Sequence, residues 1–483
     1  MINIQNTSLL EFSNLPAART ASEVCDALHA AGFQAFFVGG CVRDLLLGRP
    51  VNDLDIATSA TPEDIERVFA GHVIPVGKSF GVMLVKHGAH VFEVATFRTD
   101  GGYADGRRPD HVEFSTAERD AQRRDFTVNA LFLDPRTGEI LDFTGGLADI
   151  KTKTLRAIGN PRARFAEDHL RLLRAARFTA VLGFSLDPET RAAVAELAPL
   201  LDSVAAERIA AEFFKGLRDA PRPSGFLELL DGLNLLARFL PEARAMRGCE
   251  QPPQFHPEGD VWTHTCLMLD GLPPPPRDLA LTLATLFHDI GKPPTFEIVH
   301  RPDGTDRVRF MGHAAVGAKL AHEILARRLR QPMELADEVS EIVRDHMMFH
   351  EFKKMRPANQ RRLMGKPTFQ KTLEVNRLDM LHSVRDLAAN DFARARFEAF
   401  TNEPVLPEPW VRGADLIAAG LAPGPHFGAL LKRAYDAQLE NLYPGKDALL
   451  RAALGWAKSI HNPSGTPHER TRTHPRRHPP PTR

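Results

Sequence analysis

Two short stretches near the start of the chain decide its fold: Gly39-Gly40-Cys41-Val42-Arg43-Asp44 and Asn52-Asp53-Leu54-Asp55-Ile56-Ala57-Thr58. Alternate side chains of a strand share a face, so Asp53 and Asp55 should point one way while Leu54 and Ile56 point into a core. Two such carboxylates can hold a pair of Mg²⁺ ions, which activate an attacking hydroxyl and neutralise charge on a leaving pyrophosphate. The glycine pair lets backbone N–H groups approach a phosphate, and Arg43 can add a bidentate contact. An isolated Asp-x-Asp is common on surface strands, but beside the glycine pair it predicts nucleotidyl transfer.

The composition limits the class of protein without identifying one. With 483 residues, 43% hydrophobic and 25% charged, the chain should form several domains with packed cores. It has no apolar run long enough to span a bilayer, no signal-peptide pattern, and four scattered cysteines without C-x-x-C spacing. A cytoplasmic protein with reduced thiols and no membrane contact fits best. A formal net charge of zero argues against a general nucleic-acid coat but leaves room for a local basic groove.

The N-terminal region has the pattern of an α+β domain. Helices are expected at about 22–31 and 43–47, and strands at 36–38, 82–85 and 91–97. The segment 98–109 is glycine-rich and polar, which predicts a mobile loop. From about residue 156 the pattern becomes helical, over about 156–240, 261–400 and 409–460. Past His461 the composition is mostly Pro, His, Thr and Arg, which predicts a disordered basic tail.

Two further groups of polar residues are expected on helices. Asp125 and Asn129 are four residues apart, so an acceptor and an amide should share one helix face, where they could hold ribose hydroxyls. An ordinary ion-paired helix start explains that spacing equally well. Asp168 and Arg171 could present an acceptor and donors to a base edge. Spacing alone favours a simpler pair, Glu167 with Arg171, which contributes about 0.2–0.5 kcal/mol.

The four motifs together resemble one known family. The series Gly39-Gly40-x-Val42-Arg43-Asp44, Asp53-x-Asp55, Arg123-Arg124-Asp125-Phe126-Thr127-x-Asn129 and Glu167-Asp168-x-x-Arg171 is similar in order and spacing to class II tRNA nucleotidyltransferases and bacterial poly(A) polymerases. The resemblance covers about residues 30–245. It implies a polymerase-β-like head, an all-α neck and body, and template-free addition of CMP and AMP, from CTP and ATP, to the 3′ end of tRNA.

The resemblance also implies roles for individual residues. Asp53 and Asp55 would be the catalytic carboxylates that bind Mg²⁺, and Asp168 with Arg171 would pair with the incoming base. The full set implied for nucleotide binding is Gly39, Gly40, Arg43, Arg124, Asp125, Asn129, Asp168, Arg171 and Arg174. Glu207-Arg208-Ile209 resembles a neck element that steadies the base-reading helix. Glu93 is a candidate third acid, although a structural partner of an arginine is an equal alternative.

One departure from the family bears on the product. Some poly(A) polymerases carry paired arginines after the first carboxylates, whereas this chain has Gly77-Lys78-Ser79-Phe80-Gly81-Val82-Met83-Leu84-Val85. That difference favours CCA addition over polyadenylation, and leaves open whether CCA, CC or only A is added. The loop ending in Arg107-Arg108-Pro109 resembles a flexible loop that helps the switch from C to A, which favours A addition.

A second set of residues resembles an HD-type metal-dependent phosphohydrolase domain. It comprises His264, the adjacent pair His288-Asp289, and Asp379. Imidazole and carboxylate ligands of this kind suit a divalent transition metal that generates hydroxide for phosphoester cleavage. By the same resemblance His313 and His346 would hold a second metal, although an ordinary surface or core position is an equal alternative for each. His350 is expected to be packing or surface.

The expected division of the chain is a nucleotidyltransferase head at 1–155, a helical neck at 156–245, an HD-type domain at 246–400, a helical segment at 401–460 and a tail at 461–483. A transferase that uses the head is favoured over a phosphohydrolase whose head only binds RNA, and a non-catalytic tRNA-binding protein is a distant third. Cations for the RNA backbone are expected at Lys353, Lys354, Arg356, Arg361 and Arg362, with a solvated helix face as a near-equal alternative. The oligomeric state stays open.

Overall fold

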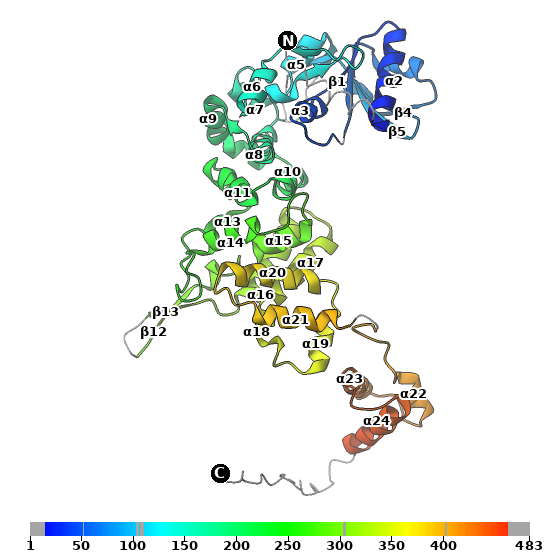
Figure 1. Ribbon diagram of the computed structural model, residues 1–483, viewed down its shortest axis with the longest axis vertical. Helices are drawn as coiled ribbons and strands as arrows, with labels where there is room; N and C mark the ends of the chain where they lie inside the picture. The colour runs from blue at the N-terminus through cyan, green and yellow to red at the C-terminus, as the bar shows by residue number, and fades with distance from the viewer. Residues whose placement is uncertain are drawn as a thin grey trace, which may run out of the picture. The chain divides into compact units, whose positions relative to one another are not determined.

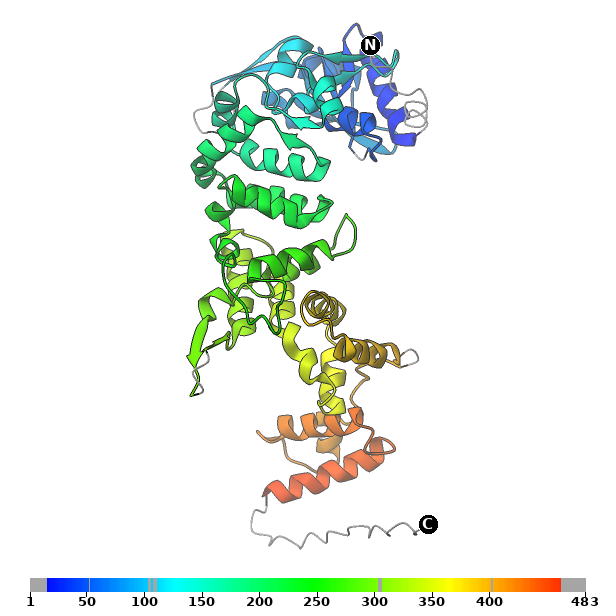
Figure 2. The same ribbon diagram turned by 60° about the vertical axis from the view of Figure 1, so that its left-hand side comes forward.

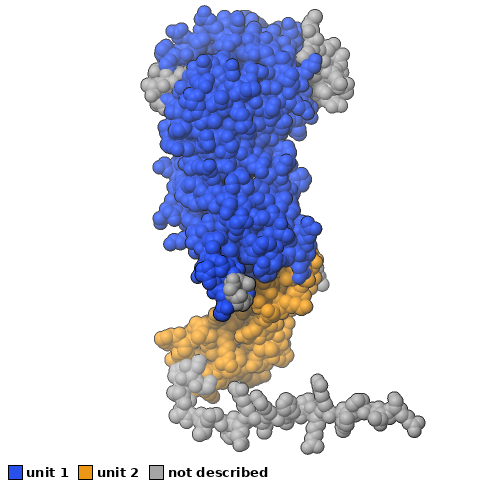
Figure 3. Space-filling model, turned by 90° about the vertical axis from the view of Figure 1, so that its left-hand side faces the viewer, with its two compact units in different colours: residues 1–347, 374–387 blue, residues 348–373, 388–483 orange. Residues whose placement is uncertain are grey.

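The computed structural model describes residues 15–51, 53–102, 106, 111–302, 306–400 and 403–461. The chain divides into two compact units, one of residues 1–347 with 374–387, the other of residues 348–373 with 388–483 (Figure 3). Each unit has hydrophobic clusters of its own. None of the described helices is long and apolar enough to cross a membrane. All four cysteines are free thiols.

The N-terminal part of the first unit is built on a seven-stranded sheet of order β3-β4-β5-β2-β1-β8-β9 (Figure 1). Neighbouring strands are antiparallel, except for the parallel pair of β2 and β5. The strands are β1 Ala35–Val38, β2 Asp55–Thr58, β3 Val73–Gly77, β4 Val82–His87, β5 His90–Thr96, β8 Leu131–Leu133 and β9 Ile140–Asp142. The helices of this part are α2 Pro16–Ala30, α3 Gly40–Leu46, α4 Pro62–Val68, α5 Ala117–Gln122 and α6 Gly146–Thr152.

The alternation of side chains along the strands gives the sheet two apolar faces. Phe37 and Ile56 join one cluster with the buried residues of α2, α3 and α4, and Leu54 packs at its edge. Phe36 and Ala57, their strand neighbours, join a second cluster with α5 on the opposite face. The expected inward direction of Leu54 and Ile56 is therefore confirmed, and Asp55, between them, lies on the α5 face of the sheet.

Two expectations about this region need correction. The strand with the carboxylates begins only at Asp55, so Asp53 precedes it. Residues 98–101, expected in a loop, form β6 (Arg98–Gly101), which pairs with β7 (His111–Phe114). Glycine and aspartate are poor strand formers, but the ladder to β7 supplies the backbone hydrogen bonds that decide the conformation. Residues 103–105 and 107–110, including Arg107 and Arg108, lie outside the described residues.

A series of helices follows the sheet in the same unit. Its elements are β10 Thr154–Leu155, α7 Pro161–Glu167, α8 Arg171–Leu182, β11 Ser185–Leu186, α9 Pro188–Leu197, α10 Ala206–Asp219, α11 Pro223–Gly232, α12 Leu236–Phe239 and α13 Pro241–Ala245. The later helices are α14 Val261–Asp270, α15 Leu279–Phe287, α16 His313–His322 and α17 Met333–Asp345, and the C-terminal part of α20 (Phe369–His382) returns to this unit. One large cluster of buried residues runs from Phe126 to Leu378 through all of them.

The helical region also contains a hairpin that its sequence pattern did not indicate. Strands β12 Glu297–His300 and β13 Asp306–Arg309 pair antiparallel and project from the helices (Figures 1 and 2). Residues 303–305, between the two strands, lie outside the described part. The predicted class, an α+β head followed by helical domains, is confirmed with this one addition.

The second unit is helical throughout its described part. It contains α18 Phe349–Phe352, α19 Pro357–Met364, α21 Ala388–Glu398, α22 Gly413–Ala418, α23 Phe427–Leu439 and α24 Lys446–His461. One cluster gathers around Phe349 and Phe369, another around Leu416 and Leu449. The expected tail beyond His461 lies outside the described residues.

Candidate functional site

A cavity of about 440 Å³ lies between the sheet and the first helices that follow it. All nine residues expected to bind a nucleotide line it, although they come from three separate segments of the chain. The lining residues are Val38, Gly39, Gly40, Arg43, Asp55, Ile56, Val82, Glu93, Ala95, Arg98, Arg123, Arg124, Asp125, Asn129, Asp168, Arg171, Arg174 and Phe178. The sequence motifs therefore meet at one place.

Two carboxylates stand side by side on the floor of this cavity. Asp55 on β2 is the direct register partner of Glu93 on β5, so both side chains leave the same face of the sheet. Desolvation and the nearby Glu93 and Asp53 carboxylates raise the pKa of Asp55 to about 6, because they outweigh the opposite effect of Arg124. Asp53 is exposed and is not among the residues that line the cavity. The observed carboxylate pair is thus Asp55 with Glu93, with Asp53 two residues away.

A glycine turn closes one side of the cavity. Gly39 has a positive φ of 78°, a conformation that favours glycine, and α3 begins at the next residue. A Cβ atom at Gly39 would lie 3.3 Å from Nη1 of Arg124, so the missing side chain lets that guanidinium come close to the turn. The first N–H groups of α3 have no partner within the helix. The turn can therefore receive an anion.

A chain of polar contacts links Arg43 to Arg174. Nη1 of Arg43 donates to Oδ1 of Asn129 at 2.5 Å, and Nδ2 of Asn129 donates to Oδ1 of Asp125 at 3.1 Å. Nε and Nη2 of Arg174 both donate to Oδ2 of Asp125, at 2.9 and 2.6 Å. Burial opposes ionisation of Asp125, but Arg174 outweighs it and lowers the pKa of Asp125 to about 2. Asp125 is therefore an anion at neutral pH.

Asp125 and Asn129 do not lie on one helix, contrary to the sequence-based expectation. Helix α5 ends at Gln122, Asp125 follows it, and Asn129 ends a single 3-10 turn, Thr127–Asn129. Asp125 also accepts from the N–H of Phe126 at 2.8 Å. This local bond competes with helix continuation. The two side chains are neighbours because the chain turns back on itself.

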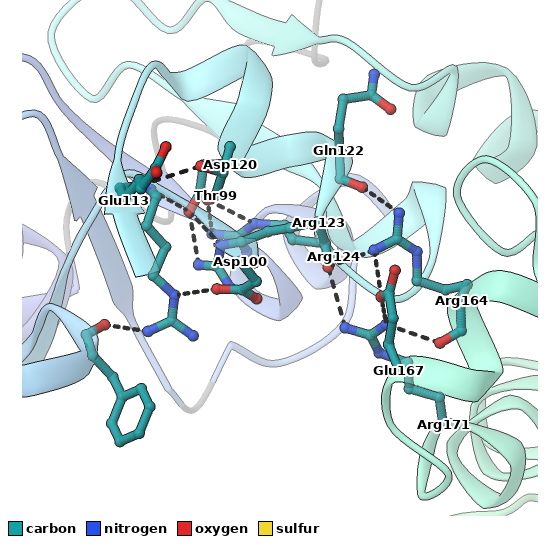
Figure 4. Close-up of polar contacts among 12 residues, drawn as sticks. Thr99, Asp100, Glu113, Asp120, Gln122, Arg123, Arg124, Arg164, Glu167 and Arg171 are labelled. Carbon is teal, nitrogen blue, oxygen red and sulfur yellow. Dashed lines mark hydrogen bonds and ion pairs between the residues drawn. The ribbon is translucent and has the colours of Figure 1, made fainter. Parts of the chain in front are cut away.

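Asp168 and Arg171 lie at a junction between two helices. Asp168 is extended after the end of α7, and Arg171 is the first residue of α8. Nη1 of Arg171 contacts Oε2 of Glu167 at 2.6 Å and the carbonyl oxygen of Arg164 at 3.0 Å, and Nη2 donates to the carbonyl of Arg123 at 3.2 Å (Figure 4). The simple pair of Glu167 with Arg171 is therefore present. Within the described part of the chain, three of the five N–H donors of Arg171 are engaged, and the residue lines the cavity.

Residues next to these motifs hold them in place. Nη2 of Arg208, from the expected neck element, lies 3.3 Å from both carboxylate oxygens of Asp168. Asp120 is 1% exposed and accepts from Arg123 at 2.7 and 2.9 Å and from Arg124 at 3.0 and 3.1 Å (Figure 4). Asp120 is not among the residues expected from the sequence. Its spacing of three residues from Arg123 and four from Arg124 is the signal that could have indicated it. Phe178 in the cavity wall was missed too.

A second group of residues meets inside the helical part of the first unit. His264 on α14, His288 and Asp289 after α15, His313 at the start of α16, His346 after α17 and Asp379 on α20 converge there. The ring centroids of His264 and His288, of His288 and His346, and of His313 and His346 are 5.4, 5.5 and 5.5 Å apart. Nε2 of His264 lies 3.2 Å from Oδ1 of Asp379. All four expected ligands, with both optional histidines, therefore form one cluster.

Backbone carbonyls orient three of these histidines in the same way. Nδ1 of His288 contacts the carbonyl of Thr285 at 2.9 Å, and His313 and His346 contact Phe310 and Val343 at 2.9 and 2.6 Å. Because a carbonyl oxygen only accepts, each Nδ1 is the donor, which leaves Nε2 as the nitrogen that could bind a metal ion. The three Nε2 atoms have no hydrogen-bond partner within the described structure. Such an arrangement fits metal ligands whose second nitrogen is held by an outer contact.

Asp289 lies at the centre of the cluster. Its Oδ1 is 3.4 Å from Nε2 of His313, and its Oδ2 is 3.1 Å from Nε2 of His288 and 2.6 Å from Nζ of Lys292. Ligand atoms of His264, His288 and Asp289 lie within 4.8 Å of one another, and so do those of Asp289, His313 and His346. Burial opposes ionisation of Asp289, but the neighbouring cations hold its pKa well below the ordinary range. One carboxylate is thus shared by two ligand sets.

Two residues of this cluster were missed in the sequence. Oε1 of Glu258 lies 2.6 Å from Nδ1 of His264 and 2.8 Å from Nδ1 of His256. Burial alone would lower the pKa of His264, but Asp379 and Glu258 outweigh it and raise that pKa to about 9. By contrast, burial and the charge of His288 lower the pKa of His346 to about 4. The loop before α14 carried no periodicity that could have indicated Glu258 or His256.

The five cations expected to contact RNA lie in the second unit and are not one open patch. Arg361 is 4% exposed and donates to the carbonyls of Pro404 and Val405, so it is buried in the fold instead of facing solvent. Arg356 pairs with Glu440 at 2.8 Å, and Arg362 with Asp436 at 2.5 Å. Lys354 pairs with Glu351 at 3.1 Å, and Lys353 lies 5.7 Å from the ring centroid of Phe392. Arg361 is too buried to contact RNA in this structure, and RNA contact by the other four cations stays a prediction.

Family models match the chain in three places. The poly A polymerase head domain matches residues 35–156, the probable RNA and SrmB-binding site of polymerase A matches 183–246, and the HD domain matches 260–382. The first match contains the carboxylates and the Asp125–Asn129 segment, and the third contains the histidine cluster. The boundaries of the expected domains stay predictions.

Curated relatives are similar over part of their length. The CCA-adding enzyme of Enterococcus faecalis is 42% identical over 252 residues, which cover 51% of this chain and 61% of that enzyme. The CCA-adding enzyme of Lactobacillus delbrueckii is 48% identical over 196 residues, which cover 40% of this chain and 49% of that enzyme. The alignments therefore span about half to six tenths of these relatives.

Solved structures are similar over nearly the whole chain. The crystal structure of the Bacillus stearothermophilus CCA-adding enzyme in complex with CTP has a TM-score of 0.68 and 27% identity, covering 93% of this chain and all of that one. The Thermotoga maritima CCA-adding enzyme complexed with tRNA has a TM-score of 0.60 and 18% identity, covering 94% and 99%. The second likeness is one of fold alone.

Proposed function

We propose that this protein, a member of the class II tRNA nucleotidyltransferase and bacterial poly(A) polymerase family, adds CMP and AMP from CTP and ATP to the 3′ end of tRNA without a nucleic-acid template. The observation that carries the proposal is the single cavity that gathers all four motif groups. It offers a turn for phosphates, carboxylates for metal ions, a buried Asp125–Asn129 pair for a ribose, and a polar junction for a base. CTP and ATP have these four chemical parts.

The carboxylates suit Mg²⁺. Asp55 and Glu93 provide oxygen ligands on one face of the sheet, and Asp53 is close enough in the chain to join them. When bound, Mg²⁺ would help to deprotonate the tRNA 3′ hydroxyl and neutralise charge on the leaving pyrophosphate. Burial raises the pKa of Asp55 most, and the nearby Glu93 and Asp53 carboxylates raise it further; carboxylates this close together favour cation binding.

The protein's own cations would hold the triphosphate. Arg43 and Arg124 line the cavity beside the glycine turn, and Asp44 and Asp120 hold Nε and Nη2 of each in place, so their other N–H groups would donate to phosphate oxygens. Their charges would neutralise the negative charge that develops on pyrophosphate during transfer. A positioned guanidinium of this kind stabilises the transition state more than the ground state. Asn129, fixed by Arg43 and Asp125, would orient the ribose.

Base selection would depend on Asp168 and Arg171. Within the described part of the chain, Arg171 is fixed by Glu167 and two backbone carbonyls, and two N–H donors remain. Asp168 is steadied by Arg208 and supplies carboxylate acceptors next to those donors. A rigid acceptor and donor pair can read the edge of a cytosine or an adenine. The ion pair with Glu167 therefore supports this reading instead of replacing it.

The product is tested with purified protein and tRNA transcripts that end before CCA, after C and after CC. Each is incubated with Mg²⁺ and CTP, ATP or both, and the new 3′ ends are sequenced. Addition of CC with CTP and of a single A with ATP supports CCA addition. Only CC, only A, or a long A tract would instead assign one of the alternative products.

A second activity is proposed for the histidine cluster: metal-dependent hydrolysis of a phosphoester. The specific observation in its favour is Asp289, which is ionised, belongs to two sets of possible metal ligands, and lies 3.1 and 3.4 Å from Nε2 of His288 and His313. Imidazole with carboxylate suits Mn²⁺, Co²⁺, Ni²⁺ or Zn²⁺ better than Mg²⁺. A bound ion of this type would supply hydroxide near neutral pH. His264, His288, Asp289 and Asp379 would hold one ion, and Asp289 with His313 and His346 the other.

The second proposal is tested by metal binding before activity. Apo-protein is titrated with Co²⁺ and the visible absorption of the bound ion is recorded. The His288→Ala/Asp289→Ala variant should lose that absorption, whereas His350→Ala should keep it, because His350 is exposed and outside the cluster. Absence of Co²⁺ absorption in the wild-type protein would contradict the assignment.

We also propose that tRNA contacts the second unit. Its residues 348–373 and 388–461 contain fifteen Lys and Arg against nine Asp and Glu, although the whole chain has a formal net charge of zero. A local excess of this kind favours a polyanion. Lys353, Lys354 and Arg356 are the exposed candidates among the five cations expected from the sequence.

A further inference from the structure

Phe178 is an apolar residue in an otherwise charged part of the cavity wall. It lies on α8, is 7% exposed, and lines the cavity with Arg43 and Arg174. The guanidinium carbons of Arg43, Arg174 and Arg177 lie 5.1, 5.1 and 3.9 Å from the centroid of its ring. One phenyl ring therefore contacts three cations, each within the distance at which a cation is attracted to the ring face.

Each of these cations also has a polar partner on its other side. Arg43 donates to Asn129 through Nη1 and to Asp44 through Nε and Nη2, at 2.9 and 2.8 Å, and Arg174 donates to Asp125. Arg177 donates to Oε2 of Glu212 at 2.5 Å, and Glu212 is 6% exposed. The three guanidiniums repel one another, so their positions depend on attraction to the acids and to the ring. Only Arg43 and Arg174 reach the cavity.

We infer that Phe178 is a positioning residue for nucleotide binding, since its ring holds Arg43 and Arg174 toward the phosphates and ribose of the incoming nucleoside triphosphate. The inference rests on the proposed nucleotidyl transfer. Phe178 itself takes no part in chemistry. An apolar side chain of similar size would fill the same space in the core but would not attract the two guanidiniums.

The substitution Phe178→Leu separates the ring from the volume. Phe178→Tyr keeps an aromatic face and serves as the conservative rescue. The matched control is Phe184→Leu, because Phe184 is 6% exposed, belongs to the same hydrophobic cluster, and has no cation near its ring among the described residues. KM for CTP and ATP and kcat are measured for all three variants with a tRNA acceptor.

Phe178→Leu should raise KM for both nucleotides about tenfold, with kcat within about threefold of wild type. Phe178→Tyr and Phe184→Leu should each keep KM within about threefold. Partial unfolding lowers the amount of active enzyme and hence apparent kcat, but it leaves KM unchanged, so a folding defect cannot imitate the expected result. Equal KM values for Phe178→Leu and Phe184→Leu, in a wild-type enzyme that incorporates nucleotides, would overturn the inference. Lack of incorporation by the wild type would instead overturn the proposed function.

Discussion

The ion pair between Asp125 and Arg174 should be strongly coupled, and a double-mutant cycle can measure that coupling. The substitutions are Asp125→Asn and Arg174→Gln, alone and together. Both keep approximate shape and remove one charge each. Asp125 is 8% exposed, and two N–H donors of Arg174 meet its Oδ2 at 2.9 and 2.6 Å. Removing one partner of such a pair leaves a buried charge uncompensated.

The magnitude follows from the pKa of Asp125. A pKa of about 2 in place of 3.8 corresponds to about 2.4 kcal/mol in favour of the charged form, at 1.36 kcal/mol per pKa unit. Arg174→Gln should therefore cost about 3 kcal/mol at pH 7. Asp125→Asn should cost less, about 1.5 kcal/mol, because Arg174 keeps Glu212 at 3.8 Å. The double variant should lose about 2.5 kcal/mol, so the coupling is about 2 kcal/mol.

The pH dependence has a definite sign. A carboxyl group whose folded pKa is depressed stabilises the fold above its unfolded pKa, and that contribution is lost as pH falls through the folded pKa. The stability difference between wild type and Asp125→Asn should therefore be nearly equal at pH 7 and 5, and should fall by about 1.1 kcal/mol, about three quarters of its value, at pH 3. The assay is urea unfolding followed by far-UV circular dichroism. Coupling below about 0.5 kcal/mol, or a difference that widens on acidification, would refute the reasoning.

Three further substitutions test the sites. Asp55→Asn should lower nucleotide addition by at least ~10³-fold, because a metal ligand is lost, and should leave tRNA affinity in a filter-binding assay near wild type, because the phosphate contacts remain. Addition within a few-fold of wild type would be inconsistent with the proposed role of Asp55. Arg171→Ala should relax the choice among the four nucleoside triphosphates in competition assays, whereas unchanged selectivity with lower stability would leave Arg171 as only the ion-pair partner of Glu167. The double variant His288→Ala/Asp289→Ala should abolish metal-stimulated cleavage of 2′,3′-cyclic phosphates and keep CTP and ATP incorporation within a few-fold of wild type. A parallel loss of incorporation in folded protein would contradict the existence of two separate sites.

Much of the site could be predicted because its chemistry is carried by short local motifs. The glycine turn and Asp55 depend on strand and turn rules that act over a few residues, and both appear where the sequence places them. The convergence of His264, His288, Asp289 and Asp379 from distant helices does not follow from such rules. That convergence was expected only from the family resemblance. In the structure, one hydrophobic core packs these helices together and so brings the four residues into one place.

The errors arose where longer-range contacts decide the structure. Asp125 and Asn129 suggested a helix by spacing, but a local hydrogen bond to Phe126 and the ion pair with Arg174 favour a turn. Residues 98–101 have weak strand propensity and become a strand only by pairing with residues 111–114. Phe178 was missed because nothing in a sequence marks an aromatic residue as the partner of three cations.

The central claim is that Asp55 is a catalytic carboxylate of a CCA-adding site. The most direct test compares Asp55→Asn with Asp26→Asn and measures incorporation of labelled CMP and AMP into a tRNA transcript that ends before CCA. Both substitutions remove one carboxylate from the same part of the chain, but Asp26 is exposed on α2, away from the cavity lining. The account predicts a transcript extended by CCA with wild type and Asp26→Asn, and an unextended transcript with Asp55→Asn. Extension by Asp55→Asn at the rate of Asp26→Asn, or no extension by the wild type, would contradict it.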